Sequence, residues 1–575
     1  MKNYRKTYCL AAMLCLTASV FAFAGGEPER RSRRDSTYEI KAVPWGPNGE
    51  QIESARRRVL GSPEVKDLLG STAHRLLAFN SEDRADSNKN SLPPTHFLAV
   101  FYDYTNDRTF IARGDYAGRE RISVSESDLR MDVSATHEEI LDAFEVVSRD
   151  PDLGAAYKRG KIELFAPMPP LSFINGERLV NIGVRDNASG VDRIIGVSFK
   201  NGKVVDYGED APRASVTGSN CGIPNSGQGA STSGTGTLAV TTSISQQTIW
   251  EMIVVRPSMS SGNVNEGSGI EVRDVKYKGK SVLKRGHAPI LNVKYHPGGC
   301  GNFRDWQNAE GFFQAPDAGS SEPVPGYRQL ATGQVAQTAV ESGNDSGNFQ
   351  GVAIYQQDVG LGLELVLVTE MNAGWYRYIM EWRFAEDGTI RPRYGFGSVS
   401  SGCVCAARNH HVYWRFDFDI VSPNNDVYKV ERGRKFLSPI TTETKMFRNY
   451  QTNRSILIEN SDGDEAYTIV PNITDEEAYN LEGSVLQTFG AGDLWILKFA
   501  GSENSPGEID DPNSTNAANI DPWVNSEAIG NSDAVIWYGA HQFRNDATSL
   551  TNFDRSGLVM GGVHTVGPDL RPVRW

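Results

Sequence analysis

Two consecutive histidines in the segment RNHHVYWRFDF, residues 408–418, are the clearest candidates for chemistry in this sequence. Neutral imidazole is a common nitrogen ligand of Cu²⁺, which favours tetragonal sites built from nitrogen and oxygen ligands. The segment reads as a β-strand, on which His410 and His411 would point to opposite faces. A β-bulge between them would turn both imidazoles to one side. The segment therefore predicts a metal-binding strand.

Two carboxylates end the same predicted strand. Asp417 and Asp419 are two residues apart, so their side chains share one face of a strand. Carboxylate oxygens are the ligands that Ca²⁺ prefers. The pair is a candidate for a structural calcium site, although acidic pairs of this kind more often face solvent.

Four cysteines lie beyond the first 24 residues: Cys221, Cys300, Cys403 and Cys405. An even number in an exported chain predicts one or two disulfides, and the sequence leaves their pairing open. Cys403 and Cys405 lie just before the histidine pair, so a soft Cu⁺ or Zn²⁺ site is the alternative.

A tyrosine-rich segment, NAGWYRYIMEWRFAEDGTI at residues 372–390, predicts a strand that ends in a tight turn at Asp387-Gly388. Tyr376 and Tyr378 flank Arg377 within it. The segment resembles the cofactor strand of copper amine oxidases, which carries Asn-Tyr-Asp/Glu-Tyr, an aromatic-rich strand and then Asp-Gly.

The resemblance implies that Tyr376 is the catalytic tyrosine that copper oxidises to the cofactor topaquinone. Two neighbours depart from the family motif, because Trp375 stands in the place of Asn and Arg377 in the place of Asp or Glu.

The family binds copper through His-x-His on one strand and a later histidine. In this alignment His410 is the second ligand and Arg408 stands at the first, where a guanidinium cannot bind copper. His541 matches the third ligand after a deletion of two residues, and His564 is the alternative. The copper ligands expected from the resemblance are His410, His411 and His541.

Amine oxidation through a quinone also needs a carboxylate base, which removes a proton from the α-carbon of the bound substrate. The resemblance points to residues 298–313 for this base. Asp305 is the predicted base and Glu310 the alternative. Asn308 stands at the base position when the shape of the family string is matched, and an amide cannot act as a base.

The order of predicted elements indicates an α+β protein. Residues 40–125 and 130–207 each predict a small α/β domain, and 208–236 read as a Gly/Ser-rich linker. Residues 237–575 are rich in strand patterns with glycine-containing turns, which predicts a large antiparallel β-sandwich. The helical patterns span 50–77 and 135–164. The resemblance covers most of the chain after residue 24, at four separate places in the order of the family, and implies a homodimer.

Residues 1–24 read as a secretory signal, with Lys2, Arg5 and Lys6 before an apolar run that ends in Ala-Phe-Ala. We therefore expect export to the periplasm or the extracellular space. No later apolar run is long enough to span a bilayer. The net charge of −13 argues against nucleic acid as a partner and mildly favours a cationic substrate.

Together these features predict copper- and quinone-dependent oxidative deamination of a small primary amine to an aldehyde, ammonia and hydrogen peroxide. Two alternatives stay open: a non-catalytic exported relative that binds a ligand or partner protein, and a copper oxidase with altered chemistry. The substitutions at Trp375, Arg377 and Arg408 favour the alternatives.

Overall fold

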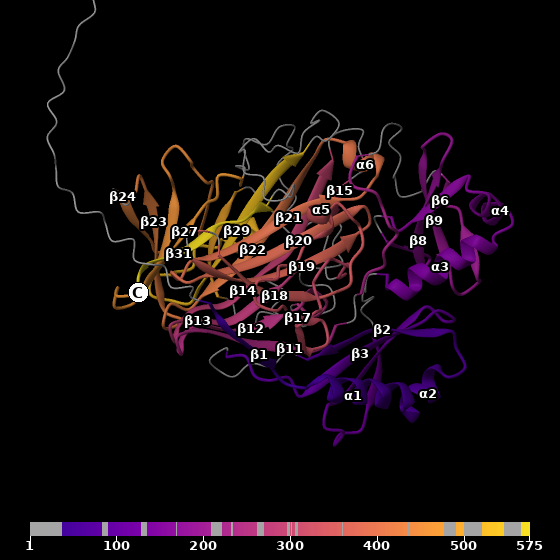
Figure 1. Cartoon of the computed structure of the whole chain (residues 1–575), viewed down its shortest axis with the longest axis horizontal. Coiled ribbons are helices and arrows are strands. Elements are labelled where there is room, and N and C mark those ends of the chain that lie inside the picture. Colours follow the sequence, from indigo (N-terminus) through magenta and orange to yellow (C-terminus); the bar gives the residue numbers. More distant parts are fainter. Residues whose placement is uncertain are drawn as a thin grey trace, which may run out of the picture. The chain divides into compact units, whose positions relative to one another are not determined.

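The computed structural model describes residues 37–82, 90–127, 135–167, 170–208, 221–231, 234–260, 269–295, 300, 302–304, 309–358, 360, 362–433, 436–475, 490, 492–499, 520–544 and 565–575. Strands dominate, and they form four sheets. Every described strand pair is antiparallel except β17–β18. In Figure 1 the strands of the two large sheets run from magenta to yellow, except the indigo edge strand β1, while the elements of the two small sheets are indigo and purple.

The first large sheet has the order β1-β11-β12-β13-β14-β22-β29-β28-β25, with β15 paired to β14. Its strands are β1 (Glu39–Pro44), β11 (Thr237–Ile244), β12 (Gln247–Val255), β13 (Glu271–Tyr277), β14 (Lys280–Tyr295), β15 (Asn302–Arg304), β22 (Arg408–Phe418), β25 (Thr444–Met446), β28 (Leu494–Lys498) and β29 (Ala534–Arg544).

The second large sheet has the order β16-β17-β18-β19-β20-β21-β31-β27-β26-β23-β24, with β30 paired to β21. Its strands are β16 (Ser321–Val324), β17 (Tyr327–Gln329), β18 (Val352–Asp358), β19 (Leu363–Ala373), β20 (Tyr376–Ala385), β21 (Ile390–Ser398), β23 (Asn425–Glu431), β24 (Phe436–Ile440), β26 (Ser455–Asn460), β27 (Ala466–Val470), β30 (Thr565–Val566) and β31 (Asp569–Arg574).

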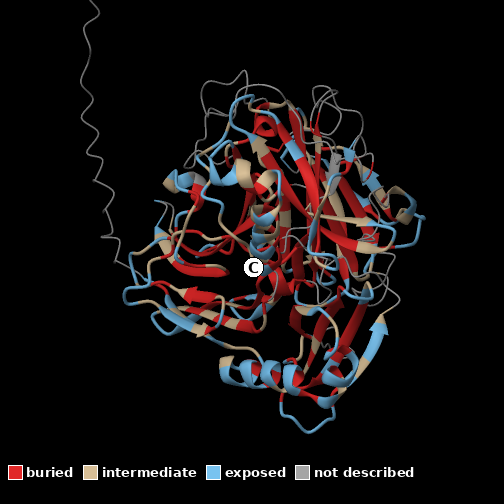
Figure 2. Ribbon diagram, turned by 90° about the vertical axis from the view of Figure 1, so that its right-hand side faces the viewer, coloured by how far each residue is buried: buried red, intermediate tan, exposed pale blue. Residues whose placement is uncertain are grey.

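The two large sheets face each other through aromatic side chains, which confirms the predicted sandwich. Trp382 on β20 meets Trp414 on β22 edge to face, with ring centres 5.5 Å apart. Every residue of β22 is buried, and Figure 2 shows the long strands mostly in the red of buried residues. Burial of each large apolar side chain contributes about 1.5–3 kcal/mol, so these strands are rigid supports for the side chains they carry.

Two smaller helix-and-sheet units also match the predicted fold class. The first has α1 (Gly49–Gly61), α2 (Pro63–Leu69), β2 (His74–Ser81), β3 (His96–Asp103), β4 (Arg108–Asp115) and β5 (Ser123–Ser127). The second has α3 (His137–Arg149), α4 (Leu153–Lys158), β6 (Ile162–Phe165), β7 (Leu171–Ile174), β8 (Glu177–Asp186), β9 (Asp192–Ser198) and β10 (Lys203–Val205). No helix in the described ranges has the length and apolar character needed to cross a membrane.

The helices are shorter than the sequence pattern predicted. Residues 74–77 are not helical but begin β2, and 162–164 belong to β6. Both segments pair with neighbouring strands, β2 with β3 and β6 with β8. Tertiary pairing has overridden local propensity there. The helix starts, in contrast, carry capping boxes of the expected kind, at Asn48 and Thr136.

The predicted linker spans residues 208–236, and 221–231 of it lie against the sandwich. Cys221 and Ile223 form bridges to Ser401 and Val399, and Ser231 pairs with Glu310. The disulfides are Cys221–Cys405 and Cys300–Cys403. Both fix the short helix α6 (Gly402–Cys405), which leads into β22. The cysteines are therefore paired with each other and do not form the alternative thiolate metal site.

Candidate metal and cofactor site

Tyr376 and His410 lie next to each other across the sandwich. Tyr376 begins β20 in one large sheet, His410 is on β22 in the other, and their ring centres are 5.0 Å apart in an edge-to-face contact. Only 1% of the Tyr376 surface is exposed. The structure thus brings the predicted cofactor tyrosine against one of the predicted copper ligands.

The Tyr376 hydroxyl is held by a second tyrosine that the sequence did not single out. Tyr295, at the end of β14, makes a short hydrogen bond to it. The indole N–H of Trp375 donates to the same Tyr295 oxygen over 3.0 Å. Burial, and then the neighbouring Tyr376 oxygen, raise the pKa of Tyr295 well above its ordinary value. Trp375 therefore helps to hold the hydroxyl groups of Tyr295 and Tyr376 in place.

Arg408 also contacts the Tyr376 ring. Its guanidinium carbon lies 5.6 Å from the ring centre, in cation–π geometry. Its Nε donates to Nε2 of His410 over 3.3 Å, and another guanidinium nitrogen donates to the carbonyl of Ala406 at 3.0 Å. Burial, followed by the charges of Arg408 and Arg544, lowers the pKa of His410 well below its ordinary value. His410 is therefore a neutral imidazole that accepts from Arg408.

The neighbouring strand β29 adds no imidazole to this face. Gln542 lies opposite His410 and Arg544 lies opposite Arg408 in the antiparallel register. Directly opposed residues share a face of the sheet. The face toward Tyr376 thus carries one imidazole, one amide and two guanidinium groups, and a guanidinium has no lone pair for a metal. These residues do not fit a copper site made of three imidazoles.

His411 and His541 meet on the opposite face of the same strands. They are directly opposed in the β22–β29 register, and their Nδ1 atoms are 2.9 Å apart. That register runs without a break from Arg408 to Asp417, so the bulge that would turn His410 to the same side is not there. The structure brings together two of the three predicted ligands and sets His410 apart from them.

A carboxylate that the sequence did not single out supports this pair. Asp493, just before β28, lies with Oδ1 3.0 Å from Nε2 of His541. Its Oδ2 accepts the backbone N–H of Arg448 at 2.7 Å. Burial acts to raise the pKa of Asp493, but the Arg448 charge and the His541 hydrogen bond hold it below its ordinary value. Asp493 is therefore an ionised acceptor, and Nε2 of His541 donates.

Arg377, which stands where the family motif has Asp or Glu, forms a buried ion pair with Asp345. It is almost fully buried and makes a two-pronged ion pair with Asp345, at 2.6 and 3.0 Å. It also donates to Asn372 Oδ1 at 2.8 Å and to the carbonyls of Gly374 and Tyr376 at 2.9 Å. The arginine thus fixes the turn that leads from β19 into Tyr376.

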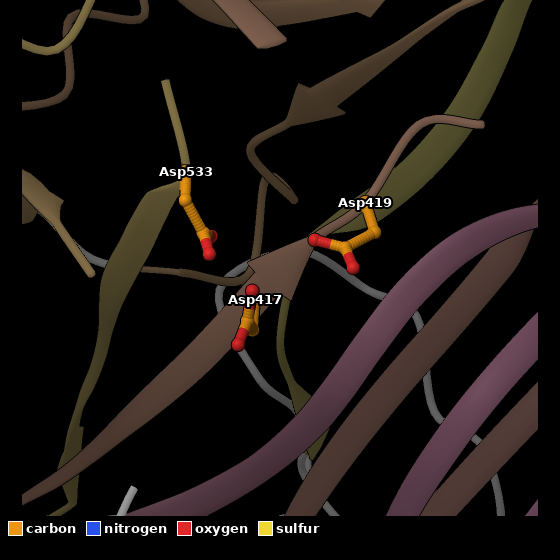
Figure 3. A group of neighbouring side chains, drawn as sticks. All are labelled: Asp417, Asp419 and Asp533. Carbon is orange, nitrogen blue, oxygen red and sulfur yellow. The ribbon is translucent and has the colours of Figure 1, made fainter. Parts of the chain in front are cut away.

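Three aspartates gather at the other end of β22. Asp417, Asp419 and Asp533 have carboxylate oxygens that all lie within 4.8 Å of one another. Figure 3 shows the three side chains directed toward a common space, two from β22 and its end and one from just before β29. The sequence predicted the first two as a calcium site. Asp533 was missed because the pairing of β22 with β29 brings it there.

The remaining predicted site residues divide into two groups. Asp305, the predicted base, and His564, the alternative ligand, lie outside the described residues, as does Asn308. Glu310, the alternative base, is buried and accepts from Arg256 at 2.8 Å and from the Ser258 hydroxyl at 2.8 Å. Its carboxylate is therefore engaged in holding β12 and the turn after it.

No protein-family model and no curated protein sequence matches the chain. Solved structures match over most of its length. The copper-containing benzylamine oxidase of Hansenula polymorpha matches with a TM-score of 0.57 and 14% identity, over 92% of this chain and 97% of that protein. The lysyl oxidase of Pichia pastoris matches with a TM-score of 0.54 and 12% identity, over 92% and 90%. An amine oxidase of Aspergillus nidulans matches with a TM-score of 0.51 and 12% identity, over 92% and 88%. The chain therefore has the fold of the copper amine oxidases.

Proposed function

We propose that this chain is a non-catalytic exported protein that uses the copper amine oxidase fold to bind a ligand or a partner protein. The observation that carries the proposal is the position of Arg408, whose guanidinium lies over the Tyr376 ring and donates to His410. Export through residues 1–24 and assembly as a homodimer belong to the same proposal.

Electrostatics support this reading. A divalent ion bound by His410 beside Tyr376 would lie within a few ångströms of the buried Arg408 charge. The +2 charge of the ion and the +1 charge of Arg408 would repel each other by roughly 7 kcal/mol at about 5 Å and an effective dielectric constant of about 20. A site with one imidazole cannot offset such a repulsion, because the other side chains on that face are an amide and two guanidinium groups.

The surroundings of Tyr376 also oppose quinone formation. Tyr378 stacks on the ring at 5.2 Å, His410 meets its edge and Tyr295 holds its hydroxyl. Conversion to a quinone needs copper beside the ring, molecular oxygen and a ring that can turn. Each of these contacts restrains the ring, so Tyr376 is expected to stay an unmodified tyrosine.

The cavity beside the turn before Tyr376 is small. It has a volume of about 40 Å³ and is lined on one side by Asn372, Ala373 and Gly374 and on the other by His137 and Ile140 of α3. A single water needs about 10–15 Å³ by this measure, so the cavity has room for a few waters. An amine substrate would not fit there without a rearrangement.

Amine oxidation stays the second candidate because one observation favours it. Tyr376 lies against His410, as the predicted cofactor and copper ligand should. For this candidate to hold, Arg408 would have to move away from the ring and a copper ion would have to replace it. A primary amine would then be the substrate, and a carboxylate such as Asp305 the base.

One experiment distinguishes the non-catalytic binding protein from the amine oxidase. The protein without residues 1–24 is loaded with copper in air and examined for a visible quinone absorbance, for a redox-cycling stain and for hydrogen peroxide release from a panel of primary amines. The proposal predicts that wild type and Tyr376→Phe give the same blank result in all three assays. A quinone band and peroxide release that Tyr376→Phe abolishes would establish the oxidase instead.

A further inference from the structure

We propose that the disulfide Cys221–Cys405 is a site of reduction by dithiols, and that its cleavage releases residues 221–231 from the cavity beside the turn before Tyr376. These eleven residues are called the strap below. The bond joins the first residue of the strap to α6, 184 positions further along the chain. This inference goes beyond the proposed function and holds whether or not Tyr376 carries a cofactor.

The strap forms one wall of the cavity. Gln228, Gly229 and Ala230 line it, together with the turn before Tyr376 and residues of α3. Gly229 lies so close to the ring of His137 on α3 that a Cβ atom at this position would be 1.5 Å from Nδ1. The strap is therefore seated closely against α3, and its displacement would open the cavity on this side.

Apart from the disulfide, the strap is held mainly by polar contacts. In the described segment 221–231 no residue is buried, and Ile223 is packed only partly against the core. The backbone N–H of Ser226 donates to Oδ2 of Asp345 at 2.9 Å, and Nε2 of Gln228 donates to Oδ1 at 2.8 Å. Segments with few buried apolar contacts open locally at a low free energy. Cleavage of the covalent bond should therefore let the strap open.

The two disulfides of the chain differ in their access to a reductant. Cys300 and Cys403 are 2% and 1% exposed. Cys405 is 9% exposed, and Cys221 is only partly buried. A thiolate must reach one sulfur of a disulfide to attack it, so the rate of reduction depends on access. A dithiol should therefore attack Cys221 first and leave Cys300–Cys403 intact.

The reduction is a thiol–disulfide exchange. One thiolate of the dithiol attacks Sγ of Cys221, the bond to Cys405 breaks, and Cys405 leaves as a thiolate that takes up a proton. The second thiolate of the reagent then attacks the mixed disulfide, and Cys221 leaves in the same way. The dithiol is oxidised to a disulfide, and its two electrons and two protons end on Cys221 and Cys405.

The second disulfide keeps α6 in place after the first is cleaved. Cys300–Cys403 still ties α6 to the segment after β14. Arg408 donates to the carbonyls of Val404 and Ala406 at the end of this helix. Selective reduction should therefore release the strap and leave Arg408 and β22 where they are.

The test uses the oxidised protein without residues 1–24 and the small dithiol dithiothreitol. After brief exposure, free thiols are alkylated and located by the masses of their peptides, and only Cys221 and Cys405 should be alkylated. Hydrogen exchange of the same sample should become at least about 10-fold faster in residues 221–231 and stay unchanged in β22. His137, which the strap covers, should also react faster with diethyl pyrocarbonate.

Cys221→Ser with Cys405→Ser should show the open strap without any reductant. Cys300→Ser with Cys403→Ser is the matched control and should keep slow exchange in 221–231, and reoxidation of reduced wild type should restore it. The inference is overturned if reduced wild type exchanges no faster in 221–231 or leaves His137 as protected as before. It is also overturned if exchange accelerates throughout the chain, or if Cys300 and Cys403 are alkylated as quickly as Cys221.

Discussion

The guanidinium carbon of Arg408 lies 5.6 Å from the centre of the Tyr376 ring. Solved amine oxidases share the fold of the chain, and the resemblance of the sequence to their copper motif implies that Arg408 stands at a ligand position. A fixed side-chain cation thus stands where the alignment expects a ligand of copper. On the far face of the same sheet, His411 of β22 and His541 of β29 lie next to each other.

The first prediction concerns the face of β22 toward Tyr376. The double variant Arg408→His with Gln542→His should gain copper there, because it places two more imidazoles beside His410 and removes the guanidinium. The side-chain oxygen of Gln542 is buried without a hydrogen-bond partner among the described residues, so its replacement breaks no bond to that atom. Copper titration in a His411→Gln background isolates this face. Arg408→Lys with Gln542→His is the control, and equal copper binding by both would contradict the prediction.

The second prediction concerns the buried ion pair of Arg377 and Asp345. Arg377→Met should lower the free energy of unfolding by about 3–5 kcal/mol, because it leaves the Asp345 carboxylate buried without its partner. Adding Asp345→Asn should recover part of the loss. Arg108→Met, which breaks an exposed ion pair with Glu126, should cost less than about 1 kcal/mol. Urea unfolding measures all three. Equal costs for the buried and the exposed pair would contradict the prediction.

The third prediction is a pH dependence that Glu370 causes. Burial raises the pKa of Glu370 from 4.5 to about 8 in the folded protein. A carboxyl with a raised folded-state pKa favours the folded state fully below its unfolded pKa, and this contribution is lost as the pH rises toward the folded pKa. Stability should therefore decline between about pH 4.5 and 8 through this group.

Glu370→Gln removes this titration and keeps an acceptor for the backbone N–H of Ala339, which Glu370 binds at 2.6 Å. The variant should match wild type near pH 4.5 and exceed it by up to about 5 kcal/mol at pH 8 and above. Denaturant unfolding of both proteins across this range gives the difference directly. A difference that stays constant with pH would show that Glu370 does not titrate in this way.

The fourth prediction concerns the three aspartates in Figure 3. Their oxygens are close enough to share one Ca²⁺, which binds carboxylates at about 2.3–2.6 Å. Added Ca²⁺ should raise the unfolding temperature, since an ion at 100 times its dissociation constant contributes about 2.7 kcal/mol. Asp417→Asn and Asp533→Asn should abolish the shift, and Asp462→Asn, an exposed control, should keep it. An equal shift in all three variants would exclude this site.

The sequence predicted the large features of the fold because they depend on local pattern. Strand patterns after residue 237 predicted the sandwich, and Asp387-Gly388 does form the turn between β20 and β21. The predicted end of the first helical segment was wrong, because pairing of β2 with β3 makes residues 74–77 a strand. Such pairing joins distant segments and leaves no local signal.

The candidate site was less predictable for the same reason. Alternation along β22 indicated that His410 and His411 face opposite sides, but only the unbroken register with β29 excludes a bulge. Tyr295 reaches Tyr376, and Asp493 reaches His541, from segments that are distant in sequence. Neither residue belongs to a motif, so no pattern marked them. That Arg408 cannot bind copper followed from its chemistry alone.

The most direct test of the account is the mass of the peptide that contains Tyr376, measured after the protein without residues 1–24 has been loaded with copper in air. With Arg408 over the ring, that peptide should have the mass of unmodified tyrosine, in wild type and in His411→Gln alike. A peptide whose mass has increased by conversion of Tyr376 to a quinone, accompanied by visible absorbance, would contradict the account and restore amine oxidation as the function.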